Sequence, residues 1–145
     1  MAKHISNMDQ LQKALQPIMT GMIDELAKRV YETLYYFLND YYTGWIPESY
    51  RRTEAFLRSA VKVDAYPDKG GVRACVYIDT DSMDDYVNAT GYQVAQWANT
   101  GLHGGLSVNH KPRVWDSTMD ETINNGSLLQ LAVQYLRSQG ISVKS

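Results

Sequence analysis

Cysteine is almost absent from this sequence, with Cys75 as the single example among 145 residues. One cysteine excludes an internal disulfide framework. It lies in an apolar run, residues 72–78, where a buried structural cysteine is expected rather than a reactive thiol. Long hydrophobic runs are also missing. Nothing approaches the ~20 apolar residues that cross a bilayer, and the polar N-terminus predicts no signal peptide and no membrane partner.

An excess of charge of either sign is lacking too. Fourteen Lys and Arg and sixteen Asp and Glu give a net charge of −2 and a pI near 5.9. The basic residues are spread along the chain, and the longest run is Arg51-Arg52. Nucleic-acid binders normally carry a basic face, so this composition argues against electrostatic binding to DNA.

Phenylalanine is scarce, but tyrosine is abundant, with 11 Tyr and 3 Trp against 2 Phe. Tyrosine is enriched where protein surfaces meet, because it combines a large apolar area with a hydroxyl. Four aromatic residues fall within an expected loop, residues 39–50: Tyr41, Tyr42, Trp45 and Tyr50. We expect this loop to contact a neighbouring subunit or another adjacent protein of an assembly. The alternative is that it closes the end of the chain's own core.

A long amphipathic helix is predicted from Asn7, the expected N-cap, to Leu38. Pro17 is expected to kink this helix or to mark a boundary within it. Apolar residues recur every three or four positions, and five of them are expected to pack on a sheet: Leu15, Met22, Leu26, Val30 and Leu34. Two alternating runs, residues 60–66 and 72–78, predict an antiparallel hairpin with a five-residue loop.

The C-terminal third predicts short helices separated by glycines. Residues 92–99 form the first, closed by Gly101, and a flexible stretch follows up to Arg113. A second helix is expected to carry Trp115, Met119 and Ile123 on one face and to end at Asn124-Asn125-Gly126. A third begins at a capping Ser127, turns Leu128, Leu131, Ala132, Tyr135 and Leu136 inward, and ends at Gly140, before a last strand at Ile141 and Val143. These elements predict a single α+β domain, residues 1–145, with a long N-terminal helix on a small, mostly antiparallel sheet and short C-terminal helices.

No catalytic, metal-binding or cofactor-binding residues are predicted. Four aspartates, at 79, 81, 84 and 85, suggest a calcium loop that starts at Asp79. Such a loop needs Asn or Asp at position 83, Gly at 84 and Glu at 90, where this chain has Met83, Asp84 and Thr90. His103 and His110 have no zinc-binding spacing, and no serine lies in a nucleophile elbow. We therefore expect a protein that is not an enzyme.

The segment from Tyr41 to Pro47, followed by Tyr50-Arg51-Arg52-Thr53, resembles a passage of small head–tail joining proteins, the HK97-type tail-completion (neck) family of tailed phages. That passage has a tyrosine, a proline and then Tyr-x-Arg-Thr, each separated by a spacer. The resemblance continues along the chain through Val76-Tyr77-Ile78-Asp79, Val94-Ala95, the segment Gly101, Leu102, His103, Gly104 and Gly105, then Val114-Trp115-Asp116 and Gly140.

The resemblance implies a virion protein, assembled in the host cytoplasm, that joins the head connector to the tail. It implies a ring, commonly of six copies, whose neighbours are a connector or stopper and a tail tube or terminator protein. DNA would pass through its lumen without specific binding. Tyr41, Tyr42, Trp45, Tyr50 and His103 are the expected interface residues.

Two alternatives stay open. Arg52 and Thr53 are expected to be structural, although Arg51 and Arg52 could instead face the channel. The competing class of function is a small phage- or bacterium-encoded enzyme or inhibitor that is accessory to the tail.

Overall fold

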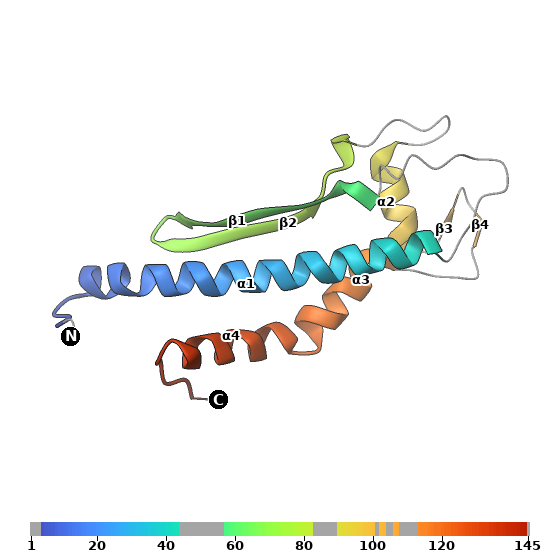
Figure 1. Ribbon diagram of the computed structural model, residues 1–145. Coiled ribbons are helices and arrows are strands. Elements are labelled where there is room, and N and C mark those ends of the chain that lie inside the picture. The colour runs from blue at the N-terminus through green and yellow to red at the C-terminus, as the bar shows by residue number, and fades with distance from the viewer. Residues whose placement is uncertain are drawn as a thin grey trace.

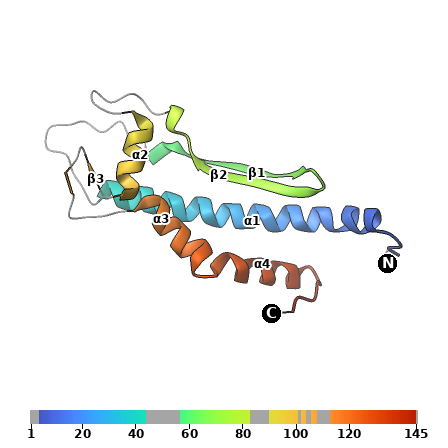
Figure 2. The same cartoon turned by 180° about the vertical axis from the view of Figure 1, so that it is seen from behind.

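The computed structural model describes residues 4–43, 57–82, 90–100, 102–103, 106–107 and 113–144. Helix α1 (Met8–Thr43) is the central element. The hairpin of β1 (Ala60–Asp68) and β2 (Gly71–Ile78) lies along one side of α1, and α4 (Ser127–Ser138) lies along the other (Figure 1; Figure 2 shows the same arrangement from behind). This is the α+β fold that the sequence predicts.

Helix α1 begins directly after its predicted N-cap. The side-chain oxygen of Asn7 accepts a hydrogen bond from the Gln10 backbone N–H at 2.9 Å. The expected boundary at Pro17 is wrong, because the helix continues through it. Pro17 is exposed, so water can reach the carbonyl that the missing N–H leaves unpaired. The expected end at Leu38 is also wrong. Residues 39–43 contain no glycine or proline that would end the helix, so it continues to Thr43, just before Gly44.

The predicted hairpin is confirmed, but its turn is shorter than expected. Two residues form it, Lys69 and Gly70, with φ of 49° and 81°. Two successive positive φ angles are what a type I′ turn requires, and this turn matches the twist of the strands. Pro67 consequently lies within β1, opposite Val72. The Gln12 side-chain amide donates to the Gly70 carbonyl at 2.7 Å and ties the turn to α1.

Helix α2 (Gly91–Thr100) confirms the helix predicted at 92–99. A reciprocal capping box starts it, in which Thr90 Oγ1 accepts from the Gln93 N–H at 3.3 Å and Gln93 Oε1 accepts from the Thr90 N–H at 2.9 Å. Two short strands follow, β3 (Leu102–His103) and β4 (Leu106–Ser107), which pair where only loop was expected.

Helix α3 (Val114–Met119) continues without a break into η3 (Asp120–Asn124), a turn of π-helix. The face that carries Trp115, Met119 and Ile123 is not the most buried one, since Trp115 and Met119 are half-buried. Thr118 and Thr122 are fully buried, whereas Ile123 is 50% exposed. Both threonine hydroxyls donate to the carbonyl four residues earlier, at 2.7 and 2.6 Å, so their burial leaves no polar group unpaired.

Helix α4 confirms the predicted final helix, with a different cap. Gly126, at φ 80°, precedes the helix, and Asn125 Oδ1 accepts from the Ser127 N–H at 3.0 Å, so Ser127 is not the capping side chain. Gly140 ends α4 as predicted, with φ 82°, and the Ile141 N–H donates to the Leu136 carbonyl at 3.0 Å. The strand expected at Ile141 is wrong. Residues 141–144 form no regular structure, and no strand in the described ranges pairs with them.

The buried core lies toward the C-terminal end of α1. Five buried residues form it: Leu34, Leu38, Val94, Ala98 and Val114. Trp97 and Trp115 pack against it in part, as do Ala60, Val76 and Ile78 of the hairpin. Of the five α1 residues expected to pack on the sheet, Met22 and Leu34 are buried, while Leu15, Leu26 and Val30 are half-buried. The N-terminal half of α1 is therefore covered only in part.

Candidate subunit interface

The two faces of the hairpin differ in what covers them. Val76 and Ile78 pack against the core beneath, so the alternation of a strand turns Arg73, Cys75 and Tyr77 away from α1. Val63 lies opposite Cys75 and shares its face. A β-bulge between Val63 and Tyr66 shifts the pairing by one residue. Tyr66 then lies opposite Arg73, which keeps it on the same face as Cys75.

This outward surface is apolar, and we call it the hairpin outer face. It comprises Val61, Val63, Tyr66, Cys75 and Tyr77. Val63, Tyr66 and Tyr77 are 38%, 41% and 43% exposed. Cys75 is half-buried among them rather than in the core, which corrects the expectation of a buried cysteine. Among the described elements, α1 is the only one that packs extensively on the hairpin. The outer face is therefore uncovered by this part of the chain.

A charge cluster holds the opposite face of the hairpin on α1. The Lys62 side chain is only 17% exposed, and its ammonium donates to Asp24 Oδ1 at 2.9 Å and to Asp64 Oδ1 at 2.8 Å. The Ala65 N–H also donates to Asp24 Oδ1, at 3.1 Å. The Lys62 hydrogen bond, followed by that from Ala65, lowers the pKa of Asp24 below its ordinary value. The hydrogen bonds to Asp64 and Asp24 raise the pKa of Lys62. Asp24 thus fixes the position of the hairpin beside the bulge.

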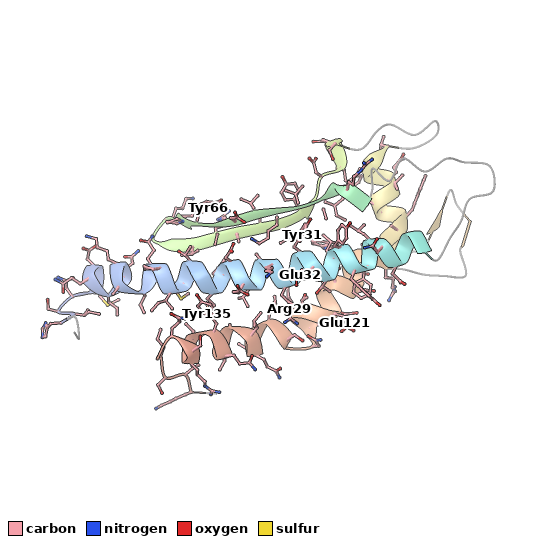
Figure 3. All side chains as sticks on the ribbon, viewed as in Figure 1. Arg29, Tyr31, Glu32, Tyr66, Glu121 and Tyr135 are labelled. Carbon is pink, nitrogen blue, oxygen red and sulfur yellow. The ribbon has the colours of Figure 1, made fainter. Side chains whose placement is uncertain are left out.

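On the other side of α1, α4 approaches closely at one point. A side chain at Gly21 would collide with the Tyr135 hydroxyl, so a larger residue there would require Tyr135 to move. Figure 3 shows Tyr135 between the two helices and Tyr31 on α1. Helix α4 carries seven apolar or aromatic residues: Leu128, Leu129, Leu131, Ala132, Val133, Tyr135 and Leu136. All of them except Leu129 and Val133 were expected to face inward. At about 100° per residue these seven cover an arc of roughly 200°.

One neighbouring helix cannot cover an arc that wide, since an ordinary amphipathic face spans about 100°. No residue of α4 is fully buried, which shows that the contact with α1 is partial. Leu129 is 70% exposed, and Val133 and Leu136 lie next to it on the helix. These three residues form the surface that we call the α4 flank.

A groove of about 620 Å³ lies between α1 and η3. Arg29 and Glu32 of α1 and Glu121 of η3 line it, together with Thr33, Tyr36 and Phe37 (Figure 3). The three charged residues are exposed to solvent, and Tyr36 is 65% exposed. Water therefore reaches every charged group, which is unlike the dry, preorganised setting in which side chains gain catalytic strength. We assign no chemistry to this groove.

The predicted interface residues are only partly placed. Tyr41 and Tyr42 lie in the last turn of α1 rather than in a loop, and their side chains are outside the described set. The backbone of His103 lies in β3. Trp45 and Tyr50 fall outside the described residues, so the aromatic loop stays a prediction.

The residues of the resemblance are placed in the same partial way. Tyr50, Arg52, Thr53, Gly101, Gly104 and Gly105 lie outside the described residues. Trp115 is described: it lies in the first turn of α3, half-buried against the core, and its backbone N–H donates to Asn99 Oδ1 at 3.0 Å. That bond joins α3 to α2, so Trp115 has a structural role here.

Sequence reasoning missed both uncovered surfaces. The alternation in residues 60–66 indicates a strand in which Val61 and Val63 alternate with Lys62 and Asp64, but it does not say which set faces α1. In fact Lys62 faces α1, because Asp24 supplies its counter-charge. The position of Lys62 between two valines was the one sequence feature that could have indicated the unusual orientation of this strand.

The described residues do not suggest a membrane span or a metal centre. No described helix is long and apolar enough to cross a bilayer. Within the same ranges, no three His, Cys, Asp or Glu side chains gather as a metal site would require. The fold and its surfaces therefore define a helix-centred α+β chain whose described residues leave apolar side chains exposed on each side of α1.

The chain belongs to the YomN family, whose model matches residues 7–138. YomN is a phage- and prophage-associated family, which makes this a phage-related protein. This match does not by itself specify the HK97-type joining family that the sequence motifs resemble. No curated protein and no solved structure matches the chain significantly.

Proposed function

We propose that this chain is a structural subunit of a tailed-phage particle, which assembles with copies of itself and joins the head connector to the tail. One observation carries the proposal: the residues that the structure describes leave apolar side chains exposed on both sides of α1. Val63, Tyr66 and Tyr77 are exposed on one side and Leu129 on the other. Soluble monomers rarely leave contiguous apolar surface in water, whereas subunits of assemblies do so before they associate.

The phage-associated family and the near-neutral charge support the same function. A lumen through which DNA moves should not bind it strongly, and the net charge of −2 suits that requirement. The resemblance of the motifs around Tyr50 and Trp115 to head–tail joining proteins adds the location in the particle. In this proposal the copies form a ring between a connector or stopper protein and a tail tube or terminator protein.

Silencing the gene in a phage that carries it tests the function. We expect filled heads and separate, complete tails, with joining restored when the chain is supplied from a plasmid. Purified wild-type particles should contain the chain as a fixed component. Joined, infectious particles in its absence would contradict the proposal and favour an accessory role, such as an enzyme or inhibitor, instead.

A further inference from the structure

We propose that the hairpin outer face of one copy packs against the α4 flank of the next copy. The inference rests on the proposed self-assembly and specifies the surfaces that carry it. The occupant of each apolar face is then a defined part of a second copy of this chain.

The positions of the two faces lead to this pairing. The hairpin and α4 lie on opposite sides of α1 in both views (Figures 1 and 2). If two hairpins paired with each other, the α4 flanks would stay in water. If two α4 flanks paired, the hairpins would stay exposed. One contact between unlike faces covers both, and a contact between unlike faces on opposite sides repeats from copy to copy until a ring closes.

The chemistry of the faces fits a dry contact. Beside the apolar side chains, the outward side of the hairpin carries Arg73 and Asp68, which already pair at 2.9 Å. Burying this face therefore strands neither charge. On the other partner, Leu129 projects from a helix whose other side rests on α1 through Tyr135. A helix laid on the free face of a sheet is a standard way to complete a layered core.

The size of the contact predicts how assembly behaves. A two-stranded sheet of nine and eight residues offers roughly 300 Å² per partner, below the roughly 800 Å² of a stable pair. Two isolated copies should thus associate weakly. Each copy in a closed ring has two such contacts, so we expect little dimer and a concentration-dependent appearance of closed rings.

Cys75 allows a direct test, because it is the only cysteine and lies on the hairpin outer face. The Leu129→Cys variant adds a second thiol at an exposed position, where folding should be unaffected. Mild oxidation of the concentrated protein should then link Cys75 to the introduced thiol of the next copy. Denaturing, non-reducing gels should show a ladder of chains that ends at the ring size.

Two controls give the ladder its meaning. The parent has Cys75 alone and should form no ladder, and Glu25→Cys places a thiol on an exposed part of α1 outside both faces. An equal ladder from Glu25→Cys would mean random collision, and a strong dimer from the parent would mean hairpin-to-hairpin pairing. Either result overturns the inference.

The inference can also fail while the proposed function stands. This is the outcome if the Leu129→Cys variant assembles into rings or enters particles and yet forms no link between copies. Absence of the chain from particles would instead remove the proposed function, whatever the gels show.

Discussion

At the scale of single residues, the carboxylate of Asp24 links α1 to β1 through two hydrogen bonds. One oxygen accepts from the Lys62 ammonium and from the Ala65 N–H, and these bonds hold the irregular part of β1 on α1. The side chain of Asp24 is 44% exposed, so solvent screens the ion pair. Its contribution to stability is accordingly below about 1 kcal/mol.

The lowered pKa of Asp24 predicts a pH effect of definite sign. Because its folded pKa lies below the ordinary 3.8, Asp24 stabilises the fold above that pH, and the contribution is lost as the pH falls through the folded value. Asp24→Asn should lower the melting temperature at pH 7 and have a much smaller effect at pH 2.5. Thermal unfolding at both pH values measures this. Asp9→Asn, which affects only an exposed i,i+4 pair, is the control. A penalty for Asp24→Asn that is the same at both pH values would contradict this role.

Burial predicts a sharp contrast between two leucines. Leu34 is fully buried, so Leu34→Ala should reduce the free energy of unfolding by about 2–5 kcal/mol through lost contacts and a cavity. Leu129 is 70% exposed, and Leu129→Ala should change it by less than about 0.5 kcal/mol in dilute solution. Urea unfolding of the two variants measures the difference. Equal losses would mean that the core is misplaced.

At the scale of elements, the approach of α4 to α1 depends on Gly21. Glycine costs about 1 kcal/mol relative to alanine inside a helix, so its presence needs a compensating contact. That contact is the Tyr135 ring, which occupies the space of a side chain at position 21.

Gly21→Ala should therefore weaken the packing of α4 on α1, although alanine favours the helical conformation of α1 itself. We expect faster amide hydrogen exchange across residues 127–138, while exchange in the hairpin stays unchanged. Adding Tyr135→Phe removes the colliding hydroxyl and should recover part of the lost protection. If Gly21→Ala slows exchange in α4, the two helices do not meet at this point.

Elements with strong local signals could be predicted from the sequence. The repeat of apolar residues gave α1, the alternation gave the hairpin strands, and Gly140 gave the end of α4. The turn length and the inward face of α3 could not be read in this way. Lys69 rarely adopts positive φ, which hides a two-residue turn, and Thr118 and Thr122 look polar until their hydroxyls bond within the helix.

The exposed apolar side chains illustrate why the proposed interface is harder to predict than the fold. Which side of a strand faces inward depends on its partners, and Lys62 turns inward only because Asp24 meets it from α1, 38 residues earlier in the chain. The tyrosine-rich composition pointed to an interface. The tyrosines of the hairpin outer face, Tyr66 and Tyr77, were nevertheless not among those singled out.

At the scale of the whole molecule, the chain is a helix with a partial cover on each side. Its small core lies near one end, and its apolar surface continues onto the free faces of the hairpin and α4. If copies of the chain cover these faces in a ring, as proposed, assembly stabilises the fold, and the melting temperature should rise with protein concentration. Differential scanning calorimetry over a hundredfold range of concentration measures this rise. A melting temperature independent of concentration would indicate a monomer.

A reconstruction of the neck of an intact phage particle that carries this chain tests the central claim most directly. We expect a closed ring of copies between the connector and the tail tube, with the hairpin of each copy against α4 of the next. Density for the neck that is complete without this chain, or a single isolated copy bound at the periphery, would contradict it.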